Sequence, residues 1–251
     1  MIPNELTKIK DWNDHWESVF KPKILTPKDF PTIITSLFKR YLPYNQHFRC
    51  LEVGCVPGRL LISFHRIFGY KIYGVDYSDK LNLVRKNVSV NKIKEYKVYK
   101  ADILQFKPKI KFDVVFSFGL IEHFVNPTLY VAKMAGLVKN GGYFIIEVPN
   151  FRNVQYIIHL LSNKGLFETH NLKYMDVKKI EKLVSKVSSI KTLYAGYFGI
   201  IQDFPYKKVF PYNVLYTLSH NFNKIANKLS LDILLSNKWT SPETVYIGRK
   251  I

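Results

Sequence analysis

Residues 51–58 read LEVGCVPG, and this stretch decides which fold the chain adopts. Its apolar start predicts a buried strand that carries the acidic Glu52, and Gly54 and Gly58 predict a turn that leads into a helix. Glycines let a backbone approach a ligand closely, with the helix N-terminus behind it. Val56 stands where a Gly-x-Gly-x-Gly pattern has its second glycine, and the GxGxxG dinucleotide fingerprint is absent. The stretch therefore predicts a strand–turn–helix loop that faces a ligand.

Short apolar stretches and helix-like stretches alternate along the chain from residue 50 onward. The expected strands are 50–53, 71–75, 96–100, 112–117, 143–148, 190–196 and 243–249. The expected helices are 58–68, 78–90, 128–138 and the amphipathic 176–187. This alternation predicts an α/β fold, with a mostly parallel, doubly wound sheet and helices on both of its faces.

Two regions lie outside this alternation. Residues 1–48 are amphipathic at helical spacing and are expected to form an N-terminal helical lid, with the α/β domain spanning 49–251. Residues 199–240 combine aromatic residues with interleaved lysines and are expected to form a cap insertion. Three uses of the cap stay open: a lid over an acceptor, a contact with an anionic membrane, and a small packed helical unit. An acceptor pocket is expected between 1–30, 150–175 and 199–240.

Acidic residues follow the second and third expected strands. Asp76 stands where a carboxylate can accept hydrogen bonds from two ribose hydroxyls, although a helix N-cap is the alternative. Asp102 can accept from an adenine amino group while Ile103 lines the ring, and a simple turn residue is the alternative. Both acids precede connections at the edge of the sheet where α/β proteins bind ligands.

In this order, the segments resemble class I S-adenosylmethionine-dependent methyltransferases, most closely their small-molecule and quinone branch, over about residues 48–150. The family pattern of an acidic residue followed by Gly-x-Gly-x-Gly is matched by Glu52, Gly54 and Gly58. Residues 112–116, the pair Glu122-His123 and the turn LVKNGG at 137–142 are similar to later family motifs.

The resemblance implies a Rossmann-like, seven-stranded methyltransferase. It implies S-adenosyl-L-methionine as cofactor, S-adenosyl-L-homocysteine as product, and a small or lipid-like methyl acceptor. The cofactor-binding residues that it implies are Glu52, Gly54, Cys55, Gly58, Asp76, Tyr77, Asp102, Ile103, Ser117 and Phe118. Val56 is the main departure, because a β-branched side chain is expected to crowd the methionine portion of the cofactor. A scaffold that keeps the fold without binding cofactor is therefore an alternative.

His123 is the candidate general base, because it follows the fourth strand and histidine titrates near neutral pH. The alternative is that Glu122 and His123 only structure the loop. Glu122, His123 and His170 are also considered as ligands of a divalent metal, but no metal site is predicted without a clear further ligand.

The chain has 251 residues, with 38 Lys and Arg against 19 Asp and Glu, a net charge of +19. This excess favours anionic partners, so nucleic acid and a peripheral membrane contact are both considered, although the lysines are spread along the chain. RNA or protein methylation is accordingly the alternative activity, whereas Ser117–Leu120 lacks the Asn-Pro-Pro-Tyr pattern of base methylation. Two cysteines, no signal core and no long apolar run lead us to expect a cytoplasmic protein without a transmembrane segment.

Overall fold

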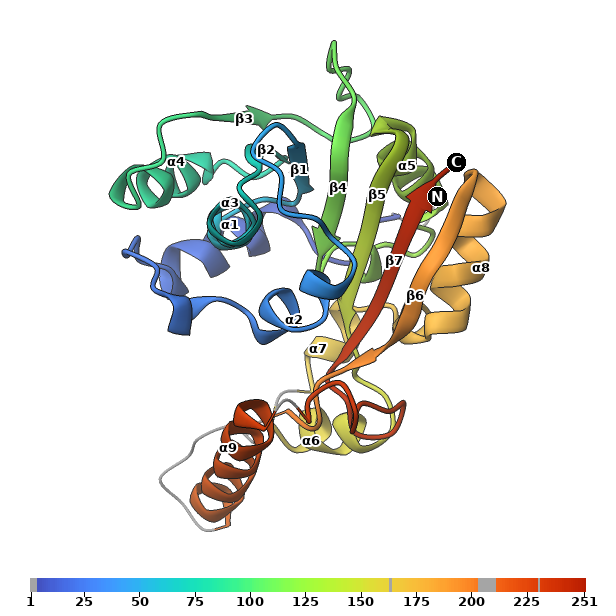
Figure 1. The fold of residues 1–251 in the computed structure, drawn as a ribbon. Coiled ribbons are helices and arrows are strands. Elements are labelled where there is room, and N and C mark those ends of the chain that lie inside the picture. The colour runs from blue at the N-terminus through green and yellow to red at the C-terminus, as the bar shows by residue number, and fades with distance from the viewer. Residues whose placement is uncertain (1–3, 163, 203–210, 230) are drawn as a thin grey trace.

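The computed structural model describes residues 4–162, 164–202, 211–229 and 231–251. Within these residues the chain forms one seven-stranded sheet with the order β3-β2-β1-β4-β5-β7-β6 (Figure 1). The strands are β1 (Arg49–Val53), β2 (Lys71–Asp76), β3 (Tyr96–Lys100), β4 (Phe112–Phe118), β5 (Val138–Pro149), β6 (Ile190–Phe198) and β7 (Glu243–Lys250). Only β7 runs antiparallel to its neighbours, so the expected mostly parallel α/β fold is confirmed.

Strand β5 begins at Val138, earlier than the sequence pattern indicates. Its pairing with β4 shifts register between Phe112 and Val114, and the residues expected as a turn form this irregularity inside the strand. Gly141 adopts a φ of +75°, and a Cβ on Gly142 would lie 2.8 Å from the Asp113 carbonyl oxygen. The two glycines therefore allow a bulge at a point where a turn was expected.

Helices cover both faces of the sheet and bury two apolar clusters. One face carries α5 (Thr128–Leu137) and α8 (Val177–Val187), and the other carries α3 (Arg59–Phe68) and α4 (Leu81–Val90). Helix α8 shows how the sequence produces this packing: Asp176 caps its N-terminus through the Lys178 N–H, and Ile180 and Val184 are buried on one side. The expected helices are confirmed on both faces.

The remaining helices connect these elements and form the flanking regions. They are α1 (Ile9–Val19), η1 (Pro27–Asp29), α2 (Thr32–Thr35), η2 (Phe38–Arg40), η3 (Ile121–His123), α6 (Val154–Ser162), α7 (Leu166–Thr169), η4 (Leu172–Met175) and α9 (Tyr212–Lys228). Every helix in the described part of the chain is too short or too polar to cross a membrane.

The N-terminal region divides into two parts. Ile33, Ile34, Leu37 and Phe38 are buried in the same cluster as α3 and α4, so residues 31–48 belong to the core of the α/β domain. Residues 4–30, here called the pocket cover, instead cross the carboxyl ends of the strands and contain α1, which buries none of its residues. The sequence pattern shows two amphipathic segments but not that they pack in different places.

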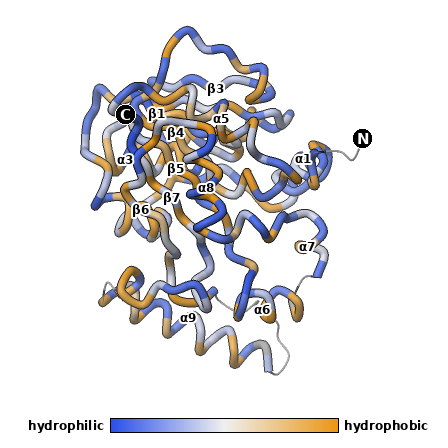
Figure 2. Tube along the Cα trace, turned by 90° about the vertical axis from the view of Figure 1, so that its right-hand side faces the viewer, coloured by the Kyte–Doolittle hydropathy of each residue, from blue (hydrophilic) through white to orange (hydrophobic). Residues whose placement is uncertain are grey.

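Helices α6 and α9 lie together beyond the lower ends of β5, β6 and β7, as Figures 1 and 2 show. Residues 154–162, 164, 211–229 and 231–240 are here called the α6–α9 lobe. Backbone and side-chain hydrogen bonds join its two parts, including Val154 N–H to the Trp239 carbonyl at 3.1 Å and Asn153 Nδ2 to the Lys238 carbonyl at 2.8 Å. The aromatic and lysine residues expected at 203–210 lie outside the described residues.

Candidate active site

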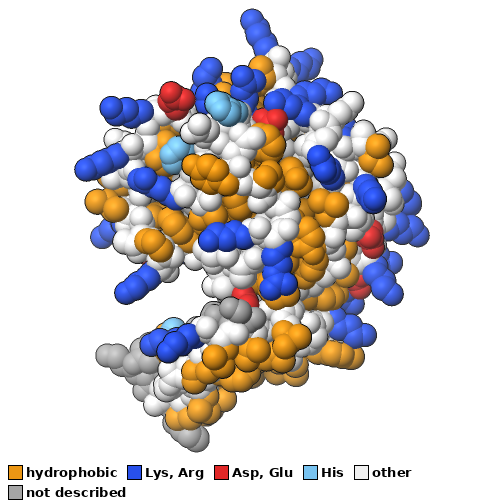
Figure 3. Space-filling model, in the orientation of Figure 1, with side chains coloured by type: hydrophobic (Ala, Val, Ile, Leu, Met, Phe, Trp, Pro, Cys, Tyr) orange, Lys and Arg blue, Asp and Glu red, His pale blue; other side chains and the backbone are white. Residues whose placement is uncertain are grey.

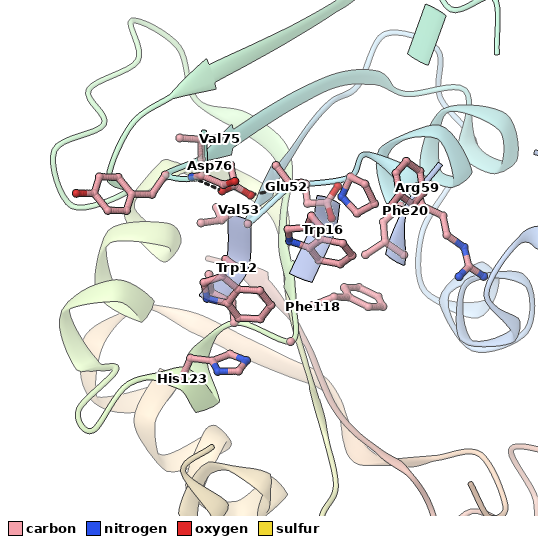
Figure 4. A pocket seen from close by; sticks show the side chains of 18 of the residues that line it. Trp12, Trp16, Phe20, Glu52, Val53, Arg59, Val75, Asp76, Phe118 and His123 are labelled. Carbon is pink, nitrogen blue, oxygen red and sulfur yellow. Dashed lines mark hydrogen bonds between the residues drawn. The ribbon is translucent and has the colours of Figure 1, made fainter. Parts of the chain in front are cut away.

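A pocket of about 940 Å³ opens at the carboxyl ends of β1, β2, β4 and β5, beneath the pocket cover (Figure 4). Parallel strands that diverge at such an edge leave a crevice, which is the usual ligand site of open α/β sheets. The pocket cover supplies Trp12, Trp16 and Phe20, and the strand ends supply Glu52, Asp76 and other polar groups, so the pocket has an aromatic wall and an acidic wall.

The acidic wall begins with Asp76 at the end of β2. Its Oδ2 accepts the Val56 N–H at 2.9 Å and its Oδ1 accepts the Ser78 N–H at 2.8 Å. Each oxygen keeps a lone pair for a further hydrogen bond. Burial raises the pKa of Asp76, and the backbone hydrogen bonds from Val56 and Ser78 oppose that rise. Asp76 therefore holds the turn after β1 in place and also faces the pocket.

Glu52 lies beside Asp76 and reaches the same pocket from β1. Its Oε2 is buried with no hydrogen-bond partner among the described residues. Burial raises the pKa of Glu52 well above its usual range, and the negative charge of Asp76 raises it further. Two adjacent carboxyl groups in a buried pocket favour a ligand that brings positive charge or hydroxyl donors.

Asp102 and Ile103 line the pocket after β3, and Tyr77 lies at its exposed rim. Asp102 Oδ1 accepts the Leu104 N–H at 2.9 Å, so this residue stabilises a turn as well as facing the pocket. Oδ1 of Asp102 therefore stabilises the turn while the residue also faces the pocket, so the two interpretations of Asp102 do not exclude each other. Phe118 lines the pocket from the end of β4, and Gly54 lies on the loop after β1.

Three of the predicted cofactor-binding residues lie off the pocket lining: Cys55, Gly58 and Ser117. Cys55 is fully buried beneath Gly74, where a Cβ would lie 2.6 Å from its Sγ. Gly58 adopts a φ of +87° and packs against Val84, which explains a glycine here without any ligand. Ser117 is fully buried in β4. The sequence pattern therefore marks residues that shape the loop together with residues that face the pocket.

Val56 lines the pocket but packs mainly into the protein. Its side chain is 4% exposed and lies in the apolar cluster with Leu61 and Val84, while its N–H holds Asp76. Most of its β-branched side chain is therefore occupied by core packing. The expectation that Val56 weakens cofactor binding stays a prediction.

His123 lies at the base of the pocket, under the pocket cover. Its Nδ1 lies 2.9 Å from the Thr169 carbonyl and 2.8 Å from Thr7 Oγ1, and its ring meets the Trp12 ring edge-on at 4.7 Å. Because a carbonyl only accepts, Nδ1 carries the proton and Nε2 holds the lone pair. Burial lowers the pKa of His123 to about 3, and the nearby His170 adds to the shift. His123 is therefore a neutral imidazole, and its role as general base stays a prediction.

Glu122, His123 and His170 come together, as the sequence analysis considered. Their ligand atoms lie within 4.8 Å of one another. Both carboxyl oxygens of Glu122 are buried without a hydrogen-bond partner among the described residues, and burial raises the pKa of Glu122 to about 8. Nδ1 of His170 lies 2.8 Å from the Leu166 carbonyl, which leaves Nε2 to face the cluster. Two imidazoles and one carboxyl group can hold either a divalent cation or a proton here.

Glu147 is a pocket residue that sequence reasoning missed. It lies near the end of β5, and burial raises its pKa well above the usual range, with Glu243 and Glu122 adding to the shift. The available signal was a carboxylate within the otherwise apolar stretch FIIEVP, which is the same signal that marked Glu52 in β1.

The pocket was expected to form between residues 1–30, 150–175 and 199–240. The pocket cover does line it, but no described residue of 150–240 does.

Comparison with known proteins gives one consistent result. A family model described as a methyltransferase domain matches residues 27–187. The chain is 27% identical over 139 residues to a ubiquinone biosynthesis O-methyltransferase of Pelagibacter ubique, covering 55% of this chain and 57% of that protein. A protein of the same name from Nitrosomonas europaea is 25% identical over 223 residues, covering 83% of this chain and 89% of its own length. For the first of these relatives the match spans only about half of the protein.

Solved structures share the fold. Phosphoethanolamine N-methyltransferase 2 of Haemonchus contortus, in complex with S-adenosyl-L-methionine, has a TM-score of 0.59 at 16% identity, over 97% of this chain and 57% of that one. Geranyl diphosphate C-methyltransferase of Streptomyces coelicolor, with S-adenosyl-L-homocysteine, has a TM-score of 0.55 at 9% identity, over 86% and 76% of the two chains.

Proposed function

The chain belongs to the methyltransferase-domain family with the class I fold, and we propose that it transfers a methyl group from S-adenosylmethionine to a small or lipid-like acceptor. The observation that carries the proposal is the row of carboxyl groups formed by Glu52, Asp76 and Asp102 along one wall of the pocket. The cofactor presents a sulfonium, an ammonium, two ribose hydroxyls and an adenine amino group, all of which suit carboxylate partners.

In this proposal Asp76 binds the ribose hydroxyls and Asp102 binds the adenine amino group beside Ile103. The sulfonium already carries an activated methyl group, so the protein acts mainly by holding the acceptor in line with it and excluding water. The pocket cover serves the second purpose, because Trp12 and Trp16 close the pocket opposite the strand ends.

The acceptor end of the pocket lies between Trp12, Phe118 and His123. Aromatic side chains on two sides favour an acceptor with a flat or apolar body. Relatives named for ubiquinone biosynthesis O-methylation support an acceptor of that kind. If the acceptor atom is a hydroxyl, the lone pair on His123 Nε2 can take its proton.

Methylation of RNA or protein rests mainly on the net charge of +19. Opposing it, six of the chain's 19 acidic residues line this pocket: Glu5, Asp29, Glu52, Asp76, Asp102 and Glu147. The same lining holds four basic residues, Lys21, Lys23, Lys28 and Arg59, so the pocket lacks the basic excess of the whole chain and offers an anionic backbone little attraction. The cytoplasmic location that the sequence favours stays part of this proposal.

Calorimetric titration of S-adenosylmethionine and S-adenosylhomocysteine into the full chain tests the cofactor site. We expect binding in the micromolar range, and a loss of roughly tenfold or more in Asp76→Asn, which keeps the shape but not the charge of the carboxylate. Asp14→Asn is the matched control, because Asp14 is exposed and lies off the pocket lining. A folded wild-type protein that binds neither compound would support the cofactor-free scaffold instead.

A further inference from the structure

The α6–α9 lobe carries an uncovered apolar surface. Leu218, Phe222 and Ile225 of α9 are 63%, 50% and 59% exposed, and Ile157 and Leu161 of α6 are 57% and 56% exposed. Figure 3 shows hydrophobic side chains gathered along the lower edge of this lobe. Single exposed apolar residues are ordinary, but a gathered set on two adjacent helices marks a surface that binds something.

On α9 the exposed apolar residues form one stripe. Val214, Leu218, Phe222 and Ile225 follow one another at spacings of four, four and three residues, which places them on one side of a helix. A neighbouring side of the helix is buried, where Ala226 is 2% exposed and Asn223 Nδ2 donates to the Ile201 carbonyl at 2.7 Å. The stripe is therefore separate from the contacts that hold α9 in place.

Within the described lobe, the exposed charged side chains all have the same sign. The exposed charged residues described in the lobe are Lys164, Lys224, Lys228 and Lys238. Its one described acid, Asp232, is 2% exposed and accepts a hydrogen bond from Ser36 Oγ at 2.8 Å. The Lys238 ammonium lies 4.9 Å from the centre of the exposed Trp239 ring. The lobe thus presents apolar side chains together with positive charge.

We propose that the α6–α9 lobe docks on the surface of an anionic lipid bilayer. Apolar side chains and an exposed tryptophan enter the boundary between headgroups and acyl chains, and the lysines contact negative headgroups. A symmetric contact with a second copy would place the same lysines near one another, which disfavours self-association through this face. This inference does not depend on the methyl-transfer proposal, because the lobe lies off the pocket.

Co-sedimentation of the full chain with vesicles tests the docking. Vesicles of 70% phosphatidylcholine and 30% phosphatidylglycerol are compared with vesicles of phosphatidylcholine alone. We expect clear binding to the anionic vesicles, weaker binding to the neutral ones, and release in high salt.

Two variants separate the apolar and the charged contributions. Leu218→Ser/Phe222→Ser and Lys224→Glu/Lys228→Glu are each expected to weaken binding to anionic vesicles roughly tenfold or more. Leu129→Ser and Lys97→Glu are the matched controls, because both residues are exposed on other parts of the molecule, and they should change binding less than about twofold. Circular dichroism and thermal melts establish that every variant is folded.

Three results would overturn the docking proposal. The wild-type chain fails to bind anionic vesicles, or the controls lose as much binding as the lobe variants. Alternatively, sedimentation velocity shows a dimer that Leu218→Ser/Phe222→Ser dissociates while vesicles stay unbound, and the face is then a contact between two copies.

Discussion

The pocket cover and the α6–α9 lobe are two amphipathic, aromatic additions to the same sheet, yet they end in different places. The cover is tied to the loops at the carboxyl ends of the strands: Asn13 Oδ1 accepts from Ser78 Oγ at 2.8 Å, and the Leu6 N–H donates to the His123 carbonyl at 2.8 Å. The described lobe makes no contribution to the pocket lining. The two additions therefore differ in where their hydrogen bonds attach: those of the cover reach the loops at the carboxyl ends of the strands, whereas Asp232 of the lobe bonds to Ser36.

The largest effect is expected where the N-terminal region enters the core. Phe38→Ala should lower the free energy of unfolding by about 3–5 kcal/mol, because the fully buried ring packs on Phe64 and Phe118. Leu218→Ala on α9 is the control and should change it by less than about 0.5 kcal/mol, because that side chain is 63% exposed. Urea unfolding measures both, and equal effects would contradict the assignment of residues 31–48 to the core.

The second prediction concerns Glu122, the neighbour of His123, and the way its ionisation changes the stability of the folded chain. Burial raises the pKa of Glu122 from its usual 4.5 to about 8 in the folded chain. Between these values the folded chain holds a proton that the unfolded chain releases, so stability falls as pH rises from 4.5 to 8. Glu122→Gln cannot ionise and should be more stable than wild type at pH 8, by on the order of a few kcal/mol, with the difference shrinking toward pH 4.5.

Thermal melts across this pH range measure the Glu122→Gln effect. They are made with a chelator present, because a cation bound by the neighbouring imidazoles would stabilise the wild-type carboxylate. Glu95→Gln is the control, since the Glu95 side chain is 81% exposed. A pH-independent difference between Glu122→Gln and wild type would show that Glu122 does not titrate with the raised pKa.

The smallest expected effect is on the affinity for S-adenosylhomocysteine, and it compares an aromatic residue of the pocket cover with one of the α6–α9 lobe. Trp12→Ala should weaken the binding of S-adenosylhomocysteine by roughly fivefold to tenfold, because the ring closes the pocket against His123. Phe222→Ala, which removes an aromatic ring of the lobe, should leave this affinity unchanged. Calorimetry measures both dissociation constants, and a loss in both variants would place the lobe, too, in contact with the ligand.

Much of the fold follows from local patterns in the chain. Every expected strand and helix is present, because strand residues alternate with helical periods and carry clear turn signals. The start of β5 differs because Gly141 and Gly142 can form a bulge as readily as a turn. Spacing alone does not distinguish the two outcomes.

The site is predicted less completely. Asp76 and Asp102 are placed on the pocket because parallel strands bring their carboxyl ends to one edge. Glu147 follows the same rule but was not predicted, because it lies inside the apolar stretch FIIEVP, which marks a strand and not a residue after its end. Periodicity identifies an amphipathic helix but not the surface that it packs on, so residues 199–240 were expected over the pocket.

Helix α1 closes the pocket without burying any of its own residues. Lifting it breaks the hydrogen bonds of Asn13 to Ser78 and Asp79, the ion pair between Lys80 and Glu17, and the contact of the partly buried Trp16 with the apolar cluster around α3 and α4. Such a segment opens at low free-energy cost while the sheet stays folded. Movement of α1 alone would therefore expose the pocket, and exchange of a bound ligand would not require the sheet to unfold.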